Sequence, residues 1–348
     1  MTIKESRAAK LAETGPCIQG FTVALVSRDE ARTPDWVRMQ LESFGIRFIH
    51  ELCHEPEAVV DAANQADVIW LFGGLEVLTE DVLKSLPRCR AILRTGSGTD
   101  SIPVTAATEL GIVVANTPEA LGDIVAEHTI GLLLSVLRQI PQHDRAMRSG
   151  VWDPAHSWPN WHLDGSTLGF VGYGYIGKLV KQKMSGFGLN FMAYDPYTAS
   201  DVFESENVRQ ATLDEVLRES DFISIHCPLT NETQHLISER EFGLMKDNAV
   251  LINAARGPIV NEEALLRALK YRSIGGAALD VFEQEPPRMD GELIHMNNIV
   301  VAPHNGGSSD LYPDSFWQDS VDTLVTMSRG KMPLWHVNKN VKPRVKFL

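Results

Sequence analysis

A glycine-rich turn between a buried strand and a helix is the feature that most restricts what this chain can fold into. The apolar run Leu168–Val171 predicts a strand, Gly172, Gly174 and Gly177 follow it, and a helical apolar pattern begins at Ile176. In this order the first glycine permits a tight turn, the second lets backbone approach a pyrophosphate, and the third lets the helix pack against the strand. The free amides and the positive dipole end of the helix then face the phosphates. The stretch therefore predicts a dinucleotide-binding unit.

An acidic residue at the end of the next strand supports this interpretation. Asn190–Asp195 predicts that strand, and Asp195 lies 18 positions after Gly177. A carboxylate at about this distance binds the ribose hydroxyls of a dinucleotide. The alternative is a glycine turn that only packs a helix in some other α/β protein. The position of Asp195 favours nucleotide binding over this alternative.

The rest of the chain alternates short apolar strands with helical patterns. Its 348 residues are enough for about two domains. Strands that alternate with helices predict parallel sheets covered on both faces. A long helix is expected over about Ile124–Ile140, ended by Pro141, and its apolar residues nearly encircle it, so it is expected to be buried between domains or subunits. The further expected elements are strands at Phe21–Val26, Arg47–Glu51, Asp67–Phe72, Ala91–Arg94, Gly111–Thr117, Phe222–His226, Ala249–Asn253, Gly276–Val281 and Asn298–His304, and a last helix at about Asp310–Met327 that returns to the first domain.

Charge and composition exclude several classes of partner. The net charge is −13 and no basic cluster is present, so no nucleic acid is expected to bind. No unbroken apolar run is long enough to span a bilayer, and the first residues lack the order of a signal peptide, so we expect a cytoplasmic protein without a membrane partner. The four cysteines are scattered without a C-x-x-C pair, so neither a disulfide framework nor a metal site is expected.

Three polar residues follow three expected strands and together suggest a reaction. They are Arg256, Glu285 and His304. The carboxyl ends of parallel strands share one crevice, where ligands of such sheets bind. An arginine there can bind a carboxylate or a carbonyl oxygen, a histidine can transfer a proton near neutral pH, and a glutamate can orient the imidazole. Each residue alone is more often surface charge, so the interpretation depends on their joint position.

A series of motifs in one order resembles the NAD-dependent, D-isomer specific 2-hydroxyacid dehydrogenase family. The resemblance implies two doubly wound parallel-sheet domains of the α/β class. A Rossmann NAD-binding domain, residues 119–306, is inserted into a flavodoxin-like substrate domain, residues 1–118 and 307–348. It also implies a homodimer that uses the long helix near residues 124–140. The motifs are Arg94–Asp100, Asn116–Pro118, Val125–His128, Gly172–Gly177, His226–Thr230, Asn253–Pro258, Ala278–Pro286 and Pro303–His304, and they cover about residues 65 to 310.

The resemblance also implies roles for single residues. Arg256 would bind the substrate carboxylate and polarise the keto oxygen, His304 would be the acid–base residue, and Glu285 its partner. Amides around Ser97 and Gly98 would hold the substrate carboxylate. The other expected cofactor contacts are Tyr175 and Ile176 at the pyrophosphate, Asp195 at the adenosine ribose, Cys227, Pro228 and Thr233 along the cofactor, and Ala254 and Asp280 beside the nicotinamide. From its position alone, Asp280 could equally be a solvated cap at a strand end.

The substrate is the least determined part of the prediction. Leu71–Leu75 carries no charge that could hold a phosphate, which favours glyoxylate, hydroxypyruvate or another small unphosphorylated 2-keto acid. Phosphoglycerate stays open, because Arg148 could supply a charge. Glu285 argues against the formate-specific relatives, which lack that residue, and Asn305 departs from the aliphatic residue common after the histidine. A non-enzymatic, NAD-sensing corepressor is the alternative from another functional class, since such proteins can retain the same three residues.

Overall fold

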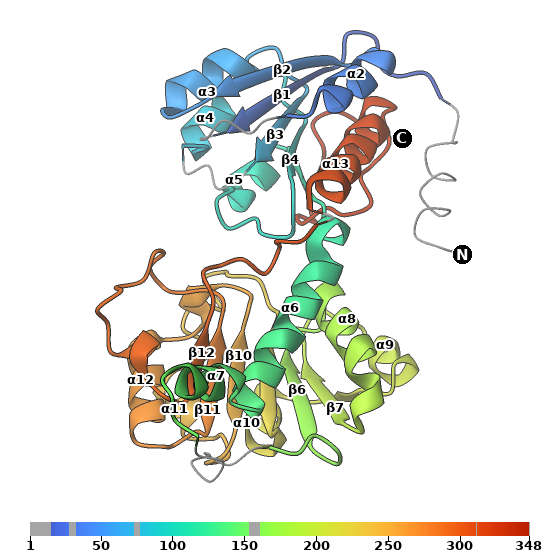
Figure 1. Ribbon diagram of the computed structural model, residues 1–348. Helices are drawn as coiled ribbons and strands as arrows, with labels where there is room; N and C mark the ends of the chain where they lie inside the picture. The colour runs from blue at the N-terminus through green and yellow to red at the C-terminus, as the bar shows by residue number, and fades with distance from the viewer. Residues whose placement is uncertain (1–14, 28–32, 73–76, 153–160, 311, 348) are drawn as a thin grey trace. The chain divides into compact units, whose positions relative to one another are not determined.

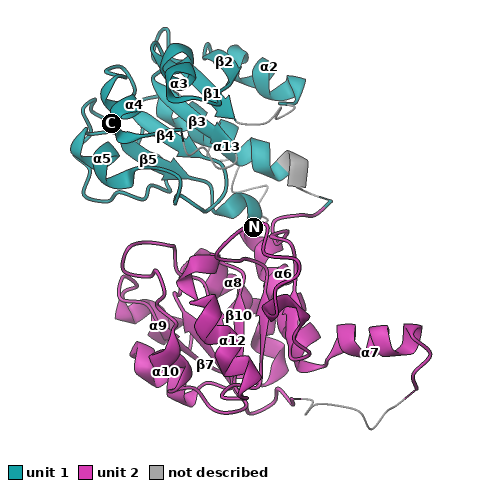
Figure 2. Cartoon of the chain, turned by 90° about the vertical axis from the view of Figure 1, so that its left-hand side faces the viewer, with its two compact units in different colours: residues 1–121, 310–348 teal, residues 122–309 magenta. Residues whose placement is uncertain are grey.

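The computed structural model describes residues 15–27, 33–72, 77–152, 161–310 and 312–347 (Figure 1). The chain divides into two compact units, which Figure 2 colours separately: residues 1–121 with 310–348 form unit 1, and residues 122–309 form unit 2. Unit 2 is one continuous segment of the sequence. Unit 1 is assembled from the segments that precede and follow it.

Unit 1 contains a parallel sheet with the strand order β2-β1-β3-β4-β5. This is the flavodoxin-like order, in which the chain reverses direction across the sheet after its first strands. Each expected strand of this region is present within one or two residues of its predicted ends. The strands are β1 (Thr22–Ser27), β2 (Arg47–Leu52), β3 (Val68–Phe72), β4 (Ala91–Arg94) and β5 (Val113–Asn116).

Helices cover both faces of this sheet because alternate strand residues point to opposite sides. Val23 and Leu25 of β1 share one apolar cluster with residues of α2 and α13, and Ala24 and Val26 share another with α3, α4 and α5. On the first face the Trp317 ring meets Trp70 edge to face, with centroids 5.4 Å apart. The helices are α2 (Asp35–Ser43), α3 (Pro56–Ala63), α4 (Glu80–Lys84), α5 (Val104–Glu109) and α13 (Tyr312–Ser328).

The segment after α13 lies against the edge strand β5. The amide of Val337 donates to the carbonyl of Val114 (2.8 Å), and the Asn338 side chain accepts from the amide of Val114 (2.9 Å). Asn338 is buried and also donates to the carbonyl of Ile112. The end of the chain therefore continues the hydrogen bonding of the sheet of unit 1.

Unit 2 contains a second parallel sheet with the order β12-β11-β10-β9-β6-β7-β8. The glycine turn follows β6, and strand order reverses between β6 and β9, which is the switch point at which Rossmann folds bind dinucleotides. The short strand β8 was not expected from the sequence. The strands are β6 (Thr167–Val171), β7 (Asn190–Tyr194), β8 (Arg209–Gln210), β9 (Phe222–Ile225), β10 (Val250–Asn253), β11 (Gly276–Leu279) and β12 (Ile299–Val301).

Two apolar cores lie on the two faces of the second sheet. Val216, Phe242 and Leu265, from α10, α11 and α12, pack on one face, and Leu133 and Val180, from α6 and α8, pack on the other. The sheet is thus buried on both sides, which explains why its strands are almost entirely apolar. The helical elements are α6 (Glu119–Leu137), α7 (Ile140–Arg148), α8 (Tyr175–Met184), α9 (Ser200–Ser205), α10 (Leu213–Glu219), α11 (Glu239–Phe242), α12 (Glu262–Lys270) and the short 3₁₀ turns Ser185–Phe187, Gly257–Ile259 and Leu293–His295.

The long helix predicted over Ile124–Ile140 is shifted in the structure. It starts earlier and ends at Leu137, and Gln139 turns the chain with a left-handed backbone (φ 51°). Pro141 does not end this helix; it lies in the first turn of α7, where proline is tolerated because no amide donor is needed. The proline therefore marks the start of the next helix.

By length and composition, α6 is apolar enough to cross a membrane. Polar residues such as Glu127, His128 and Thr129 interrupt it, so the sequence shows no unbroken apolar run. In the structure Leu133, Val136 and Leu137 are buried in the core beside β6. An apolar helix buried in a protein core passes the same test as a membrane span.

Candidate active site

The three glycines of the turn after β6 have different reasons to be glycine. Gly172 has φ 89°, and a Cβ there would lie 2.5 Å from the backbone nitrogen of Cys227. A Cβ at Gly177 would lie 3.1 Å from the carbonyl oxygen of Gly172. At Gly174 a Cβ would meet no atom of the described residues within 4 Å. The first and third glycines permit close packing within the protein, and the second leaves the open space that a ligand's pyrophosphate requires.

The start of α8 is suited to an anion. No described side chain caps this helix, whose N-cap is Gly174 and whose first residue is Tyr175. The first amides of an uncapped helix favour a phosphate. The Tyr175 ring packs where a Cβ at Gly122 would lie, so its backbone, rather than its ring, is placed at the turn. Ile176 is half-buried against the core of unit 2.

Asp195 is held directly beside the glycine turn. One carboxylate oxygen accepts from the amide of Tyr173 (2.8 Å), and the other accepts from the amides of Tyr197 (2.9 Å) and Thr198 (3.2 Å). Tyr173 is itself fixed, since its buried ring donates its hydroxyl to Glu206 (2.6 Å). The carboxylate is partly exposed at the place where a ribose would follow a pyrophosphate bound at the turn.

The loop after β9 brings together the next expected cofactor residues. Cys227 is half-buried, and burial raises the pKa of its thiol to about 12, so it is a neutral, apolar contact. The Thr233 hydroxyl donates to the carbonyl of Pro228 (2.6 Å) and accepts from the amide of Thr230 (2.8 Å). The hydroxyl therefore closes the loop into a fixed turn next to Gly172. Ala254, after the neighbouring strand β10, is half-buried against the core.

His304 and Glu285 form a direct pair. His304 Nδ1 lies 2.6 Å from Glu285 Oε2, and Glu285 Oε1 accepts from the amide of Phe282 (3.0 Å). The side chains are 48% and 37% exposed, respectively. A carboxylate at Nδ1 fixes the ring and leaves Nε2 for exchange with a substrate. The pair thus has the arrangement of an oriented acid–base residue.

Arg256 lies on a loop that packs against the one carrying Glu285. A Cβ at Gly257 would overlap the main chain of Phe282, so these two loops touch backbone to backbone. The main-chain oxygen of Arg256 accepts from the side chain of buried Asn253 (2.9 Å), and its guanidinium donates to the carbonyl of Ala255 (2.7 Å). Since β10, β11 and β12 are neighbours, the three residues lie on adjacent loops at one edge of the sheet.

Asp280, which follows β11, is buried and so is not a solvated cap. Its two carboxylate oxygens accept from the amides of Asn305 (3.0 Å) and Gly306 (2.9 Å). His128 Nε2 lies 3.2 Å from Oδ1. Burial alone would raise the pKa of Asp280, but the His128 imidazole and the two amides outweigh it, and the pKa lies below its usual range. The carboxylate is therefore ionised, and two amides of the His304 loop hold it in place.

Ser97 and Gly98 lie in the loop after β4 of unit 1. The amide of Gly96 donates to the Thr117 hydroxyl (2.8 Å), and the carbonyl of Ser97 accepts from Asn116 (2.9 Å). Gly96 has φ 92°, which favours glycine. These contacts order the loop at the carboxyl end of its strand.

Two residues bear on the question of a phosphate. Arg148 is exposed at the end of α7, where its Nε lies 2.8 Å from a carboxylate oxygen of Asp144. It is thus already paired. In the uncharged stretch Leu71–Leu75, residues 73–75 lie outside the described residues.

The sequence did not reveal the supporting residues of this site. His128 was noted only as part of a motif, and Gly257 and Gly306 were not singled out. One signal for His128 was available, namely an imidazole on a helix whose residues are mostly apolar. The two glycines could not be found in this way, because the atoms that exclude a Cβ come from distant parts of the sequence.

Comparison with known sequences gives related proteins over most of the chain. Residues 130–306 match a family described as D-isomer specific 2-hydroxyacid dehydrogenase, NAD binding domain. The D-3-phosphoglycerate dehydrogenase of Methanocaldococcus jannaschii is 41% identical over 73% of this chain, but only 48% of that protein is covered. The glyoxylate reductase of Thermococcus litoralis is 35% identical over 88% of this chain and 97% of that protein.

Solved structures with similar folds match residues of both units. A glyoxylate reductase from Paecilomyes thermophila superposes with a TM-score of 0.81 at 26% identity, over 92% of this chain and 99% of that one. A D-lactate dehydrogenase from Aquifex aeolicus, complexed with NAD and lactic acid, gives 0.75 at 27% identity, over 88% and 96%. The predicted fold class, two parallel-sheet α/β domains of which one is a Rossmann domain, is confirmed.

Proposed function

This chain belongs to the D-isomer specific 2-hydroxyacid dehydrogenase family, and from that premise we propose that it reduces a small, unphosphorylated 2-keto acid to the D-2-hydroxy acid. It is an NAD-dependent dehydrogenase. The observation that carries the proposal is the contact of 2.6 Å between His304 Nδ1 and Glu285 Oε2, on loops next to that of Arg256. An oriented imidazole beside a permanent positive charge is the machinery that reduction of a keto acid needs.

The residues of unit 2 fit the cofactor. The open space at Gly174 and the uncapped start of α8 suit the pyrophosphate, and Asp195 suits the ribose. We assign Gly172, Gly177, Tyr175 and Ile176 to the same turn, and Cys227, Pro228, Thr233, Ala254 and Asp280 to the path toward the nicotinamide. When bound, NADH supplies the hydride that reduces the keto carbon.

The chain's own residues supply the rest of the chemistry. His304 donates a proton from Nε2 to the keto oxygen as negative charge grows there. Glu285 holds the ring by Nδ1, which leaves Nε2 for the substrate. Arg256 binds the substrate carboxylate and stabilises the developing charge on the oxygen. In the oxidative direction neutral His304 accepts the hydroxyl proton.

The amides around Ser97 and Gly98 are proposed to hold the substrate carboxylate. We assign substrate binding to residues 1–118 with 307–348 and cofactor binding to residues 119–306. The compact units, 1–121 with 310–348 and 122–309, have nearly these bounds. Gly96 and Asn116 order the loop, which supports this role.

Phosphoglycerate is the second candidate substrate, and one observation favours it. The relative with the higher identity, 41%, is a D-3-phosphoglycerate dehydrogenase, compared with 35% for the glyoxylate reductase. Against it, Leu71 and Phe72 offer no charge, and Arg148 is paired with Asp144. The unphosphorylated acids therefore come first.

We also propose a homodimer in the cytoplasm. None of the residues of α7 is buried, and Figure 2 shows this helix extending away from the rest of unit 2. Ile140 and Met147 of this helix are 55% and 53% exposed, and Val151 and Trp152, which follow its end, are 51% and 79% exposed. Apolar side chains grouped on a protruding helix mark a protein interface.

The state of the cysteines supports the proposed cytoplasmic location. All four are free, as expected in a reducing compartment.

A panel of keto acids tests the proposed reaction. Glyoxylate, hydroxypyruvate, pyruvate and 3-phosphohydroxypyruvate are each supplied with NADH, and the loss of NADH absorbance is followed. We expect the unphosphorylated acids to give the higher kcat/KM. His304→Ala is expected to lower kcat by about 10²–10⁴-fold, because proton transfer is lost. Its NADH affinity, measured by fluorescence, is expected to stay within about twofold, since the glycine turn is unchanged.

Three results would contradict this proposal. Near-normal turnover by His304→Ala would show that the imidazole does not transfer the proton. A clear preference for 3-phosphohydroxypyruvate selects the second candidate substrate. Tight NADH binding with no oxidation by any acid favours a non-enzymatic NAD-binding protein.

A further inference from the structure

Asp280 is at the centre of the contacts that hold the His304 loop. Its side chain is 2% exposed. Its carboxylate accepts from the amides of Asn305 (3.0 Å) and Gly306 (2.9 Å), and its main-chain oxygen accepts from the amide of His304 (2.8 Å). One residue therefore fixes three consecutive amides, beginning at the proposed acid–base histidine.

These contacts matter because the backbone of His304 is in a costly conformation. Its φ is 50°, in the left-handed region. This region is strained for a residue other than glycine, and such a residue persists only where its surroundings hold it. Without the contacts to Asp280 the loop would relax toward negative φ. The same backbone carries the imidazole whose Nδ1 lies 2.6 Å from Glu285 Oε2.

The carboxylate of Asp280 has a further partner from a distant element. His128, in the middle of α6, places Nε2 at 3.2 Å from Oδ1, and its side chain is 23% exposed. The two loop amides are neutral donors, whereas a buried carboxylate is costly unless it is paired and hydrogen-bonded. The His128 imidazole reaches this carboxylate from outside the loop at ion-pair distance, although Nε2 is buried and does not have the geometry of a hydrogen bond to it.

At Gly306 the loop that carries His304 packs tightly against both Asp280 and His128. A Cβ at Gly306 would lie 2.8 Å from Asp280 Oδ2 and 3.3 Å from His128 Cδ2. The loop backbone thus touches both members of the pair. A shift of the His128 ring or of the Asp280 carboxylate would move the backbone two residues from His304.

From this arrangement we propose that His128 is a positioning residue for His304, acting through Asp280. The inference rests on the proposed function, in which His304 transfers the proton. His128 itself is not proposed to touch substrate or cofactor. It keeps the Asp280 carboxylate oriented toward the loop amides, and the amides keep His304 against Glu285.

Two substitutions of His128 test the proposal kinetically. His128→Leu removes the donor, and we expect kcat to fall roughly tenfold, since small misplacements of a catalytic group cost one to two orders of magnitude. KM for the keto acid is expected to stay within about twofold, and NADH affinity is expected to fall less than kcat, because His128 itself touches neither ligand in the proposed site. His128→Gln is expected to restore most of kcat, because its amide nitrogen can replace Nε2.

A third substitution covers the case in which His128→Leu does not fold. His128→Asn keeps a polar side chain, but it is one methylene shorter than glutamine and does not reach Asp280. Asn is therefore expected to behave as Leu does and Gln as the parent. His162→Leu, at an exposed histidine of the same unit, is the matched control and is expected to leave kcat unchanged.

A second readout needs neither substrate nor cofactor. Hydrogen exchange is measured by mass spectrometry on the cofactor-free protein. We expect His128→Leu to increase exchange in the segment 303–309 and to leave the glycine turn at 172–177 as protected as in the parent. This result supports the positioning role even if the keto-acid panel shows that the proposed reaction is wrong.

Other outcomes would overturn the inference. Unchanged exchange at 303–309 together with kcat within about twofold of the parent would show that His128 does not hold the loop. Equal loss with Gln and Leu would show that the donor is irrelevant. A fall in NADH affinity as large as the fall in kcat would place the effect at the cofactor instead.

Discussion

Asp195 presents a negative charge where the adenosine ribose is proposed to bind, and three backbone amides hold it there. NADP carries a phosphate on this ribose. Two like charges about 4 Å apart near a protein surface repel by several kcal/mol. We therefore predict that kcat/KM with NADH exceeds that with NADPH by roughly 100-fold or more.

Steady-state kinetics with both cofactors check this prediction, and salt provides a control. Because Asp195 is partly exposed, the repulsion is screened, and the preference is expected to narrow as ionic strength rises. Equal or better efficiency with NADPH at low salt would show that the carboxylate does not set the choice of cofactor.

Among single residues, the sequence analysis predicted those that directly follow strands. It did not identify the residues that hold them in position. Asp195, Arg256, Glu285 and His304 each follow a recognisable apolar strand, and parallel strands bring their carboxyl ends together. The contact between His128 and Asp280 joins a helix to a loop more than a hundred positions away. Neither periodicity nor turn chemistry encodes such a pairing, because it depends on how the helix packs on the sheet.

Among the elements, the loops after β10 and β11 are coupled through one glycine. Gly257→Ala places a Cβ on the main chain of Phe282, so the Arg256 loop must move away from the loop of Glu285. We predict a loss of stability of about 1–3 kcal/mol from overpacking. We also predict a fall in kcat/KM of about tenfold or more, since Arg256 is displaced.

Urea unfolding and steady-state kinetics measure the two effects. Gly186→Ala is the control, because its Cβ would meet no atom of the described residues within 4 Å and its φ is not positive. It is expected to change neither quantity appreciably. Parent-like stability and kcat/KM in Gly257→Ala would mean that the two loops are not rigidly packed.

The strands were predicted well, and the ends of helices less so. Buried parallel strands are short apolar runs, which stand out in any sequence. Pro141 was interpreted as the end of a helix, although proline suits a first turn equally well. The two residues of β8 were missed because so short a strand carries no periodic pattern.

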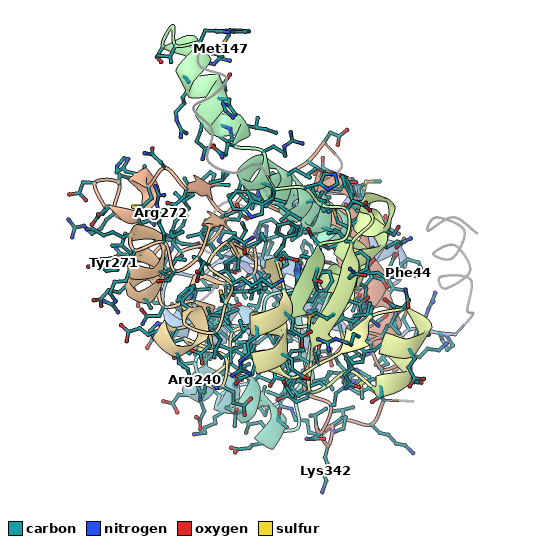
Figure 3. The ribbon with its side chains drawn as sticks, turned by 90° about the horizontal axis from the view of Figure 1, so that it is seen from below. Phe44, Met147, Arg240, Tyr271, Arg272 and Lys342 are labelled. Atoms are coloured by element: carbon teal, nitrogen blue, oxygen red, sulfur yellow. The ribbon has the colours of Figure 1, made fainter. Side chains whose placement is uncertain are left out.

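For the whole molecule, the exposed helix α7 predicts the oligomeric state. Met147 lies near its end, where Figure 3 shows it far from the body of the chain's described side chains. We predict that the protein sediments as a dimer, and that Met147→Glu shifts it toward the monomer, because a buried apolar contact would receive an unpaired charge. Sedimentation velocity over a range of concentrations is the measurement.

Tyr271→Glu is the matched control. Tyr271 is also large and exposed (75%), and it lies just after α12 on another part of unit 2, as Figure 3 shows. It is expected to leave the dimer intact. A parent protein that stays monomeric at every concentration, or equal dissociation by both substitutions, would contradict the assignment of α7 to the interface.

The return of the last helix to the first domain was expected from the order of the elements, but the division of the strands between two sheets was implied only by the resemblance to the family. Alternating strands and helices predict parallel sheets, but they do not say which strands share a sheet. The finding that the last helix belongs with the first strands reflects contacts between ends of the sequence. Local patterns contain no record of such distant pairs.

The division of unit 1 into two segments has a consequence for synthesis on the ribosome. When the first sheet leaves the ribosome, α13 and the residues next to it have not yet been made. One apolar face of the sheet, which includes Leu25, Trp70 and Leu93, therefore lacks part of its packing. All of unit 2 is translated in between, which at typical elongation rates takes on the order of ten seconds or more. Unit 2 can therefore fold completely before α13 is synthesised and packs on the first sheet. The nascent chain is most prone to aggregation in this interval, and truncations within α13 are expected to harm unit 1 and spare unit 2.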